Sequence, residues 1–131
     1  MGYIISFQRQ RQFSGNKIEK VIQEARFQLR ENIEEKVDLH ELADQYNIGY
    51  SYFRKMFKKY TGVPPAQYHL DLKLLRAKEM LLNSDLSIKE ISAKLGFQSI
   101  YYFSRVFKNK LQITPSEIRK SVQYWISGMN T

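Results

Sequence analysis

The sequence predicts an all-α protein with two helix-turn-helix subdomains joined by a central linker helix. Apolar residues recur at helical spacing in most segments after residue 16. One pattern of residues occurs twice, at an offset of 49 to 50 positions. Between the two copies lies a segment, residues 65–83, whose apolar residues fall on two opposite faces of a helix.

The linker helix is predicted over residues 65–83. A surface helix needs only one apolar face, so two opposed faces predict a packed neighbour on each side. The first face holds Tyr68, Leu72, Leu75 and Leu82, and the second holds Leu70, Leu74, Ala77 and Leu81.

Residues 1–15 show no clear period, and we interpret them as an N-terminal arm or the end of a linker from a domain outside this sequence. An amphipathic scaffold helix is expected from Lys17 to about Glu35, with Asn16 as its N-cap. It would open the first subdomain, residues 16–64.

The first helix-turn-helix follows. Asp38 is placed to cap a short helix, and Glu41 three residues later suggests a capping box. Residues 47–49, Asn-Ile-Gly, form the turn, because Asn and Gly tolerate positive φ. A second helix is expected over residues 50–60, ended by Gly62. Its buried face is predicted to hold Phe53, Met56, Phe57 and Tyr60.

The same module recurs in residues 84–124, the predicted second subdomain. Its last helix is expected from Ser116 to about Tyr124, behind Pro115. A C-terminal tail, residues 125–131, would follow, and we expect the cluster Tyr124-Trp125-Ile126 to dock on the domain rather than enter lipid. The matching pairs include Leu42 with Ile91, Tyr46 with Leu95, Phe53 with Phe103, Phe57 with Phe107, Lys58 with Lys108, and Pro65 with Pro115.

Charge also follows the repeat. The formal net charge is +8 with a pI near 9.7, which favours a polyanionic partner: nucleic acid or an acidic membrane. Eight of the thirteen acidic residues lie between Glu19 and Asp44. Residues 45–70 and 91–116 contain none, and together these two windows carry eight lysines and arginines.

Each predicted second helix of the two modules turns polar residues away from its phenylalanines. Arginine can bond bidentately to guanine N7 and O6 in the major groove, whereas lysines further along suit phosphates. Ser99 can cap the second of these helices, where exposed N–H groups also suit a phosphate. A merely solvated face is the alternative, which the duplication disfavours, and Tyr101 could instead fold back against Tyr102. The outward residues are Ser51, Lys55 and Lys58, flanked by Arg54 and Lys59, and then Tyr101, Arg105 and Lys108, with Ser104 and Asn109 at the edges.

Several classes of site have no support. The chain has no cysteine, which excludes disulfides and thiol chemistry and fits a reducing cytoplasm. His40 and His69 are far apart in sequence with no cysteine nearby, so no metal or cofactor is expected. No catalytic arrangement stands out, which argues against an enzyme. No apolar run approaches the ~20 residues that cross a bilayer.

Three strings of residues resemble the AraC/XylS family of transcriptional regulators. They are Ile88-x-Glu90-Ile91 through Gly96-Phe97, Tyr102-Phe103-Ser104-Arg105-x-Phe107-Lys108, and Thr114-Pro115-Ser116-x-x-Arg119. The segment from Leu42 to Gly62 is similar to that family's first helix-turn-helix. The resemblance covers about residues 17–120. Gly49, where a capping serine is usual, departs from it, as do Ser92, Gln112 and Ile118.

The resemblance implies a DNA-binding domain whose two recognition helices enter successive major grooves. A linker helix of ~27 Å suits readers separated by about one DNA turn of ~34 Å. Phosphate contacts are expected from Lys58, Lys59, Ser99 and Lys108. Carried over by position, the base-reading residues are Ser51, Arg54 and Lys55 in the first helix and Ile100, Tyr101, Ser104 and Arg105 in the second.

These expectations describe a bacterial, nucleoid-associated cytoplasmic regulator, more an activator than a repressor, that recruits RNA polymerase to a promoter. We interpret the chain as the DNA-binding end of a longer protein, with a homodimer formed through a sensor domain outside this sequence. A stand-alone short regulator is the alternative. Two other classes are disfavoured by the residues: a DNA-repair methyltransferase, which needs acceptor cysteines, and a non-specific basic module binding polyanions or membrane, which would expose an apolar face.

Overall fold

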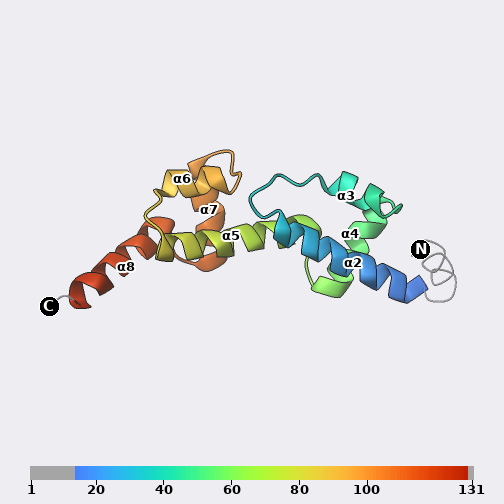
Figure 1. Ribbon diagram of the computed structural model, residues 1–131, viewed down its shortest axis with the longest axis horizontal. Coiled ribbons are helices and arrows are strands. Elements are labelled where there is room, and N and C mark those ends of the chain that lie inside the picture. Colours follow the sequence, from blue (N-terminus) through green and yellow to red (C-terminus); the bar gives the residue numbers. More distant parts are fainter. Residues whose placement is uncertain (1–13, 130–131) are drawn as a thin grey trace. The chain divides into compact units, whose positions relative to one another are not determined.

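The computed structural model describes residues 14–129, and every regular element in that range is a helix (Figure 1). The all-α prediction is confirmed. The predicted arm falls outside the described residues, apart from its last two positions. The helices are α2 (Ser14–Glu31), α3 (Leu39–Gln45), α4 (Tyr50–Thr61), α5 (Pro65–Asn83), α6 (Ile88–Lys94), α7 (Ile100–Leu111) and α8 (Pro115–Met129).

The chain divides into two compact units, each containing one helix-turn-helix. The first unit holds the residues up to Asn32 together with Val37–His69. The second holds Ile33–Lys36 together with the residues from Leu70 onward. Helix α5 therefore ends one unit with its first turn and opens the other with the rest of its length.

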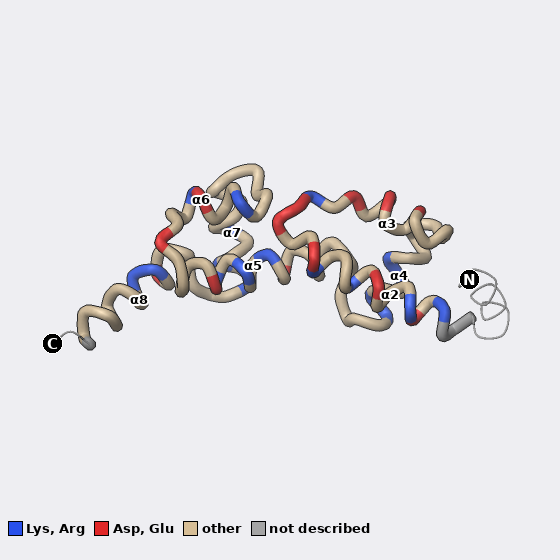
Figure 2. Tube along the Cα trace, viewed as in Figure 1, with Lys and Arg blue, Asp and Glu red and all other residues tan. Residues whose placement is uncertain are grey.

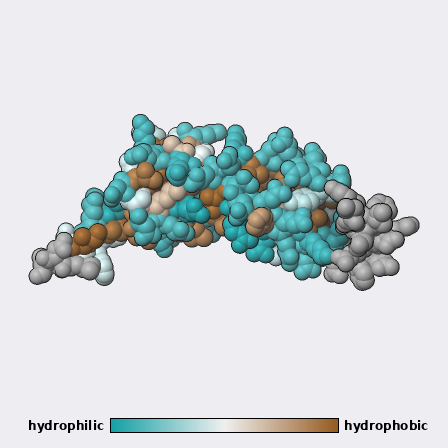
Figure 3. All heavy atoms as spheres, viewed as in Figure 1, coloured by the Kyte–Doolittle hydropathy of each residue, from teal (hydrophilic) through white to brown (hydrophobic). Residues whose placement is uncertain are grey.

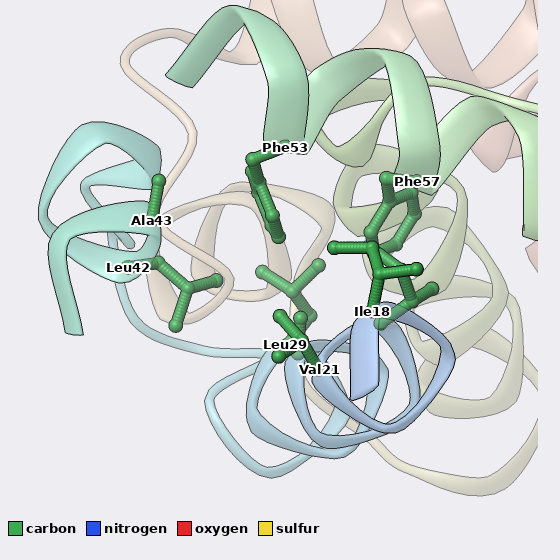
Figure 4. Close-up of a cluster of buried hydrophobic side chains, with 9 residues drawn as sticks. Ile18, Val21, Leu29, Leu42, Ala43, Phe53 and Phe57 are labelled. Carbon is green, nitrogen blue, oxygen red and sulfur yellow. The ribbon is translucent and has the colours of Figure 1, made fainter. Parts of the chain in front are cut away.

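The core of the first unit forms where α2, α3 and α4 turn their apolar faces together (Figure 4). Helical spacing puts the buried residues of α2 on one stripe. Phe53 and Phe57 of α4 are fully buried, with ring centroids 5.8 Å apart. The cluster consists of Ile18, Val21, Ile22, Ala25, Leu29, Leu42, Ala43, Phe53 and Phe57.

The second unit repeats this core with α5, α6, α7 and α8. Phe103 and Phe107 take the places of the first pair, fully buried and with ring centroids 5.6 Å apart. The assignment of all four phenylalanines to the core is thus confirmed. The cluster consists of Ile33, Leu74, Ala77, Leu81, Ile91, Leu95, Phe103, Phe107 and Ile118.

In each unit, a side chain of the last helix makes hydrogen bonds at the C-terminal end of that unit's first helix. In the first unit the imidazole Nε2–H of His69 donates to the carbonyl oxygen of Asn32 at 3.0 Å. Fifty residues later, Arg119 donates from Nε to the Leu81 carbonyl at 3.1 Å and from a terminal nitrogen to the Leu86 carbonyl at 2.7 Å. The carbonyl oxygens at the ends of α2 and α5 gain a hydrogen-bond partner in this way, and Arg119 also satisfies the Leu86 carbonyl in the segment between α5 and α6.

The short first helices of both modules are capped as helix N-termini require. The Asp38 side chain accepts from the N–H groups of His40 and Glu41, as predicted, although the reciprocal bond of a capping box forms instead between Ser87 and Glu90. Hydrogen bonding to Ser87, above all the bond that its backbone N–H donates to the exposed Glu90 carboxylate, lowers the pKa of Glu90.

Three predicted helix limits need correction. Helix α2 begins at Ser14 and ends at Glu31, so Asn16 is not its N-cap. Helix α8 continues to Met129, and residues 125–129 are helical rather than a tail.

Two predicted burials on α5 are wrong. On α5 only the face with Leu74, Ala77 and Leu81 is buried, whereas Leu75 and Leu82 of the other face are exposed. The first face, which carries these two leucines, contacts the cores only through its first residues, Tyr68 and Leu72.

The aromatic cluster near the C-terminus does not dock on the domain as expected. Tyr124, Trp125 and Ile126 are 83%, 69% and 51% exposed, and hydrophobic spheres mark this end of α8 in Figure 3. Helix α8 is anchored only near its start, where Ile118 is buried. No helix among residues 14–129 is long and apolar enough to cross a bilayer.

We expect Gln112→Gly to raise the free energy of unfolding by ~1 kcal/mol. Gln112 holds a left-handed conformation, φ 62°, at the end of α7, and this conformation costs a non-glycine residue about 1–2 kcal/mol. The bond from its Nε2 to the Asn109 carbonyl, 2.8 Å, offsets part of that cost. Urea denaturation followed by circular dichroism measures the change.

The matched control is Gly62→Gln, at the equivalent end of α4, where φ is +91° and a Cβ would meet no atom within 4 Å. It should lower stability by a similar amount. Equal stability of Gln112→Gly and the parent protein would contradict the assignment of strain to this position.

Candidate nucleic-acid interface

Helix α4 presents a cationic face because its phenylalanines fix its rotation. Tyr60, predicted on the buried face, is instead 39% exposed, because it lies in the last turn beyond the core. Basic residues in that last turn also lie near the negative end of the helix dipole. The side chains exposed opposite Phe53 and Phe57 are Ser51, Arg54, Lys55, Lys58 and Lys59.

Helix α7 presents an equivalent face of mixed character. The Ser99 hydroxyl caps it, accepting from the Tyr102 N–H at 3.1 Å as predicted. Tyr101 is 86% exposed and does not fold back against its neighbour. Ser104 is half-buried, so it is the least accessible of the predicted base-reading residues. The exposed members of the set are Ser99, Ile100, Tyr101, Arg105 and Lys108.

The Arg105 guanidinium is held in place by an aromatic ring. Its Cζ lies 5.6 Å from the centroid of the Tyr102 ring, within cation–π range. Tyr102 in turn packs near Phe97, at 6.1 Å between centroids. Arg105 stays exposed while its guanidinium makes this contact.

Charge is segregated along the chain. Figure 2 shows acidic residues gathered on the segment leading into α3, and the sequence places basic residues on α4 and α7. Lys110 pairs with Asp71 at 3.3 Å, so part of its charge is neutralised. Arg54, Lys55, Lys58, Arg105 and Lys108 have no such ion pair among the described residues.

The turns that aim the two helices use the same backbone conformation. Asn47 in the first turn has φ 58°, and Gly96, 49 positions later, has φ +81°. Gly49, which we expected to need positive φ as well, has φ −69° and serves as the N-cap of α4 without a side-chain bond. The backbone conformation at position 49 therefore does not require a glycine.

Lys73 supports the second turn, a role that no local sequence pattern indicates. Its ammonium group donates to the carbonyl oxygen of Leu95 at 2.6 Å and of Glu35 at 3.1 Å. Burial lowers the pKa of this ammonium, and the carboxylates of Glu34 and Glu35 partly offset the effect. Leu95 is the C-cap of α6, so Lys73 fixes where the turn towards α7 begins.

Both histidines make contacts that stabilise the fold. His40 stacks on the Tyr50 ring with centroids 4.0 Å apart, and His69 makes the helix-end bond described above. Among the described residues, no group of three or more His, Cys, Asp or Glu side chains could hold a metal ion.

Comparison with known proteins identifies this arrangement. A family model described as a helix-turn-helix domain matches residues 42–121, more than half of the chain. The structure of an AraC-type regulator from Chromobacterium violaceum superposes with a TM-score of 0.73 at 32% identity, covering 79% of this chain and 93% of that one. This chain belongs to the AraC-type helix-turn-helix family.

A second solved structure of the family, the DNA-binding domain of AdpA in complex with a target DNA, has a TM-score of 0.74 at 25% identity. The match covers 79% of this chain and 93% of that chain.

Curated relatives include the regulator GbdR of Pseudomonas aeruginosa, 35% identical over 89 residues, and the activator RhaS of Salmonella schwarzengrund, 30% identical over 92. These matches cover 68% and 70% of this chain. The chain spans only 24% and 33% of the lengths of these two relatives.

We expect Gly49→Ser to stabilise the first unit by a few tenths of a kcal/mol, about the difference between Gly and Ser at an N-cap. The backbone, φ −69° and ψ 149°, accepts any L residue, and a Cβ here would meet no atom within 4 Å. The new hydroxyl can accept from the Tyr52 N–H, as Ser99 does from Tyr102. Thermal and urea unfolding measure the effect.

The reciprocal change, Ser99→Gly, is the control and should lower stability. If both substitutions shifted stability in the same direction, the capping argument would fail.

Proposed function

We propose that this chain is the DNA-binding part of a bacterial transcription regulator that reads double-stranded DNA with α4 and α7. The observation that carries the proposal is an arrangement found in both units. In each, one helix buries a pair of phenylalanines and exposes cationic and polar side chains on its opposite face. A helix exposed in this way fits the major groove. The DNA complex of AdpA supports the same assignment.

Within each helix we assign two kinds of contact. Side chains near the start and middle reach base edges, whereas lysines in the last turn reach phosphates. The base-reading residues are Ser51, Arg54, Lys55, Ile100, Tyr101, Ser104 and Arg105, and the phosphate contacts are Lys58, Lys59, Ser99 and Lys108. The two helices would enter successive major grooves.

The wider role is also part of the proposal. The chain has no enzymatic activity of its own and needs no cofactor. It acts in the bacterial cytoplasm as an activator that recruits RNA polymerase, and it dimerises through a sensor domain outside this sequence. The names of the relatives, all regulators and one an activator, support regulation and activation. Their greater length is the reason for proposing a further domain.

Selection of bound sequences from a random duplex pool, at ~150 mM salt, tests the proposal. Two short motifs about one helical turn apart are expected, one for each reading helix. A single enriched motif would limit base reading to one helix. Binding without enrichment, lost steeply as salt rises, would indicate the alternative of a non-specific polyanion binder.

Arg105→Ala should weaken binding to the selected site by about 1–3 kcal/mol and relax one base position, because the lost contact is bidentate to a guanine.

Lys58→Ala should weaken binding to all sequences and reduce the salt dependence by about one unit of slope. Fluorescence anisotropy with the selected duplex and a scrambled one separates these effects. Equal losses on both duplexes from Arg105→Ala would remove its base-reading role.

A further inference from the structure

We propose that α7 recognises thymine through its C5-methyl group and that α4 does not. This proposal rests on the function proposed above. It concerns the chemistry of one half of the DNA site: a thymine close to a guanine under α7, and no methyl recognition under α4.

The first observation is exposed apolar surface at the start of α7. Ile100 is 38% exposed and Tyr101 is 86% exposed, and neither belongs to the core cluster. Both lie in the first turn, directly after the Ser99 cap. The first turn is the part of a recognition helix that contacts base edges.

The second observation is that the equivalent turn of α4 lacks this surface. Fifty residues earlier, Tyr50 occupies the place of Ile100 but is half-buried and stacks on His40 at 4.0 Å. Ser51 occupies the place of Tyr101 and offers a hydroxyl. Tyr52 and Tyr102 are equivalent and similarly exposed, at 48% and 41%, so they do not distinguish the helices.

The chemistry of the groove selects the ligand. Of the groups that bases display in the major groove, only the C5-methyl of thymine is apolar, and apolar side chains recognise it. An isoleucine and a tyrosine ring at the tip of the helix match that methyl group, whereas a serine at the same place suits hydrogen bonding.

Arg105 places a guanine near the thymine. It lies four residues after Tyr101, on the same helix face, and the Tyr102 ring holds its guanidinium. Four residues of helix rise ~6 Å, comparable to two base-pair steps of ~3.4 Å. The thymine therefore lies within about two base pairs of the guanine that Arg105 reads.

Deoxyuridine provides the test, because it differs from thymidine only by the missing methyl group. Each thymine of the selected duplex is replaced in turn by deoxyuridine, and the Kd is measured by anisotropy at ~150 mM salt. The half-site whose base preference relaxes in Arg105→Ala is assigned to α7. At least one replacement there should weaken binding roughly fourfold, the effect of one buried methyl group, and replacements in the other half-site should change it less than twofold.

Two variants link the effect to its residues. Ile100→Ser and Tyr101→Ser change exposed side chains, and circular dichroism checks that each variant is folded. One or both should lose the deoxyuridine effect. Ser51→Ala, at the matched position of α4, should keep it in full.

Several outcomes would overturn the proposal. They are an α7 half-site without thymine, uniform insensitivity to deoxyuridine, or an unchanged deoxyuridine effect in both serine variants. Insensitivity with specific binding intact would leave the function proposed above standing and assign the apolar turn to a protein partner instead. Selection without any enriched motif would overturn both.

Discussion

Burial of two phenylalanines on each recognition helix is the constraint on which the interface depends. Phe53 and Phe57, like Phe103 and Phe107, lie four residues apart and are completely buried. An i, i+4 pair locked into a core leaves a helix one possible rotation. That rotation alone puts Lys55 or Arg105 on the outside, so the outward face follows from the core rather than from any property of the charged residues.

The two units meet the same backbone demands with different residues. A left-handed residue stands in each turn, Asn47 or Gly96, and another at the end of each recognition helix, Gly62 or Gln112. His69 bonds the carbonyl at the end of the first helix in one unit, and Arg119 bonds the equivalent carbonyl in the other. Because these devices maintain the scaffold, the exposed residues are free to differ, as they do at the first turns of α4 and α7.

Much of this could be read from the sequence because its signals are local. Helix α5 was predicted with its observed limits and α4 to within one residue, since prolines, glycines and capping side chains mark their ends. The two ends of α2 and the end of α8 carry no comparable signal and were missed. The prediction of buried side chains failed where periodicity was the only evidence, as at Tyr60, Leu75 and Leu82. A helical pattern shows which residues share a face, but it does not show how far along that face the core extends.

The sequence by itself determined the helices, the duplication and the face of each recognition helix that turns outward, because helical periodicity, capping and turn chemistry act over a few residues. The tertiary structure alone decided what supports those helices. Lys73 meets carbonyl groups 22 and 38 residues away in sequence, and the Arg119 guanidinium reaches back 38 residues to the end of α5. Contacts over such separations depend on which segments the completed core brings together, and no local pattern of residues encodes them.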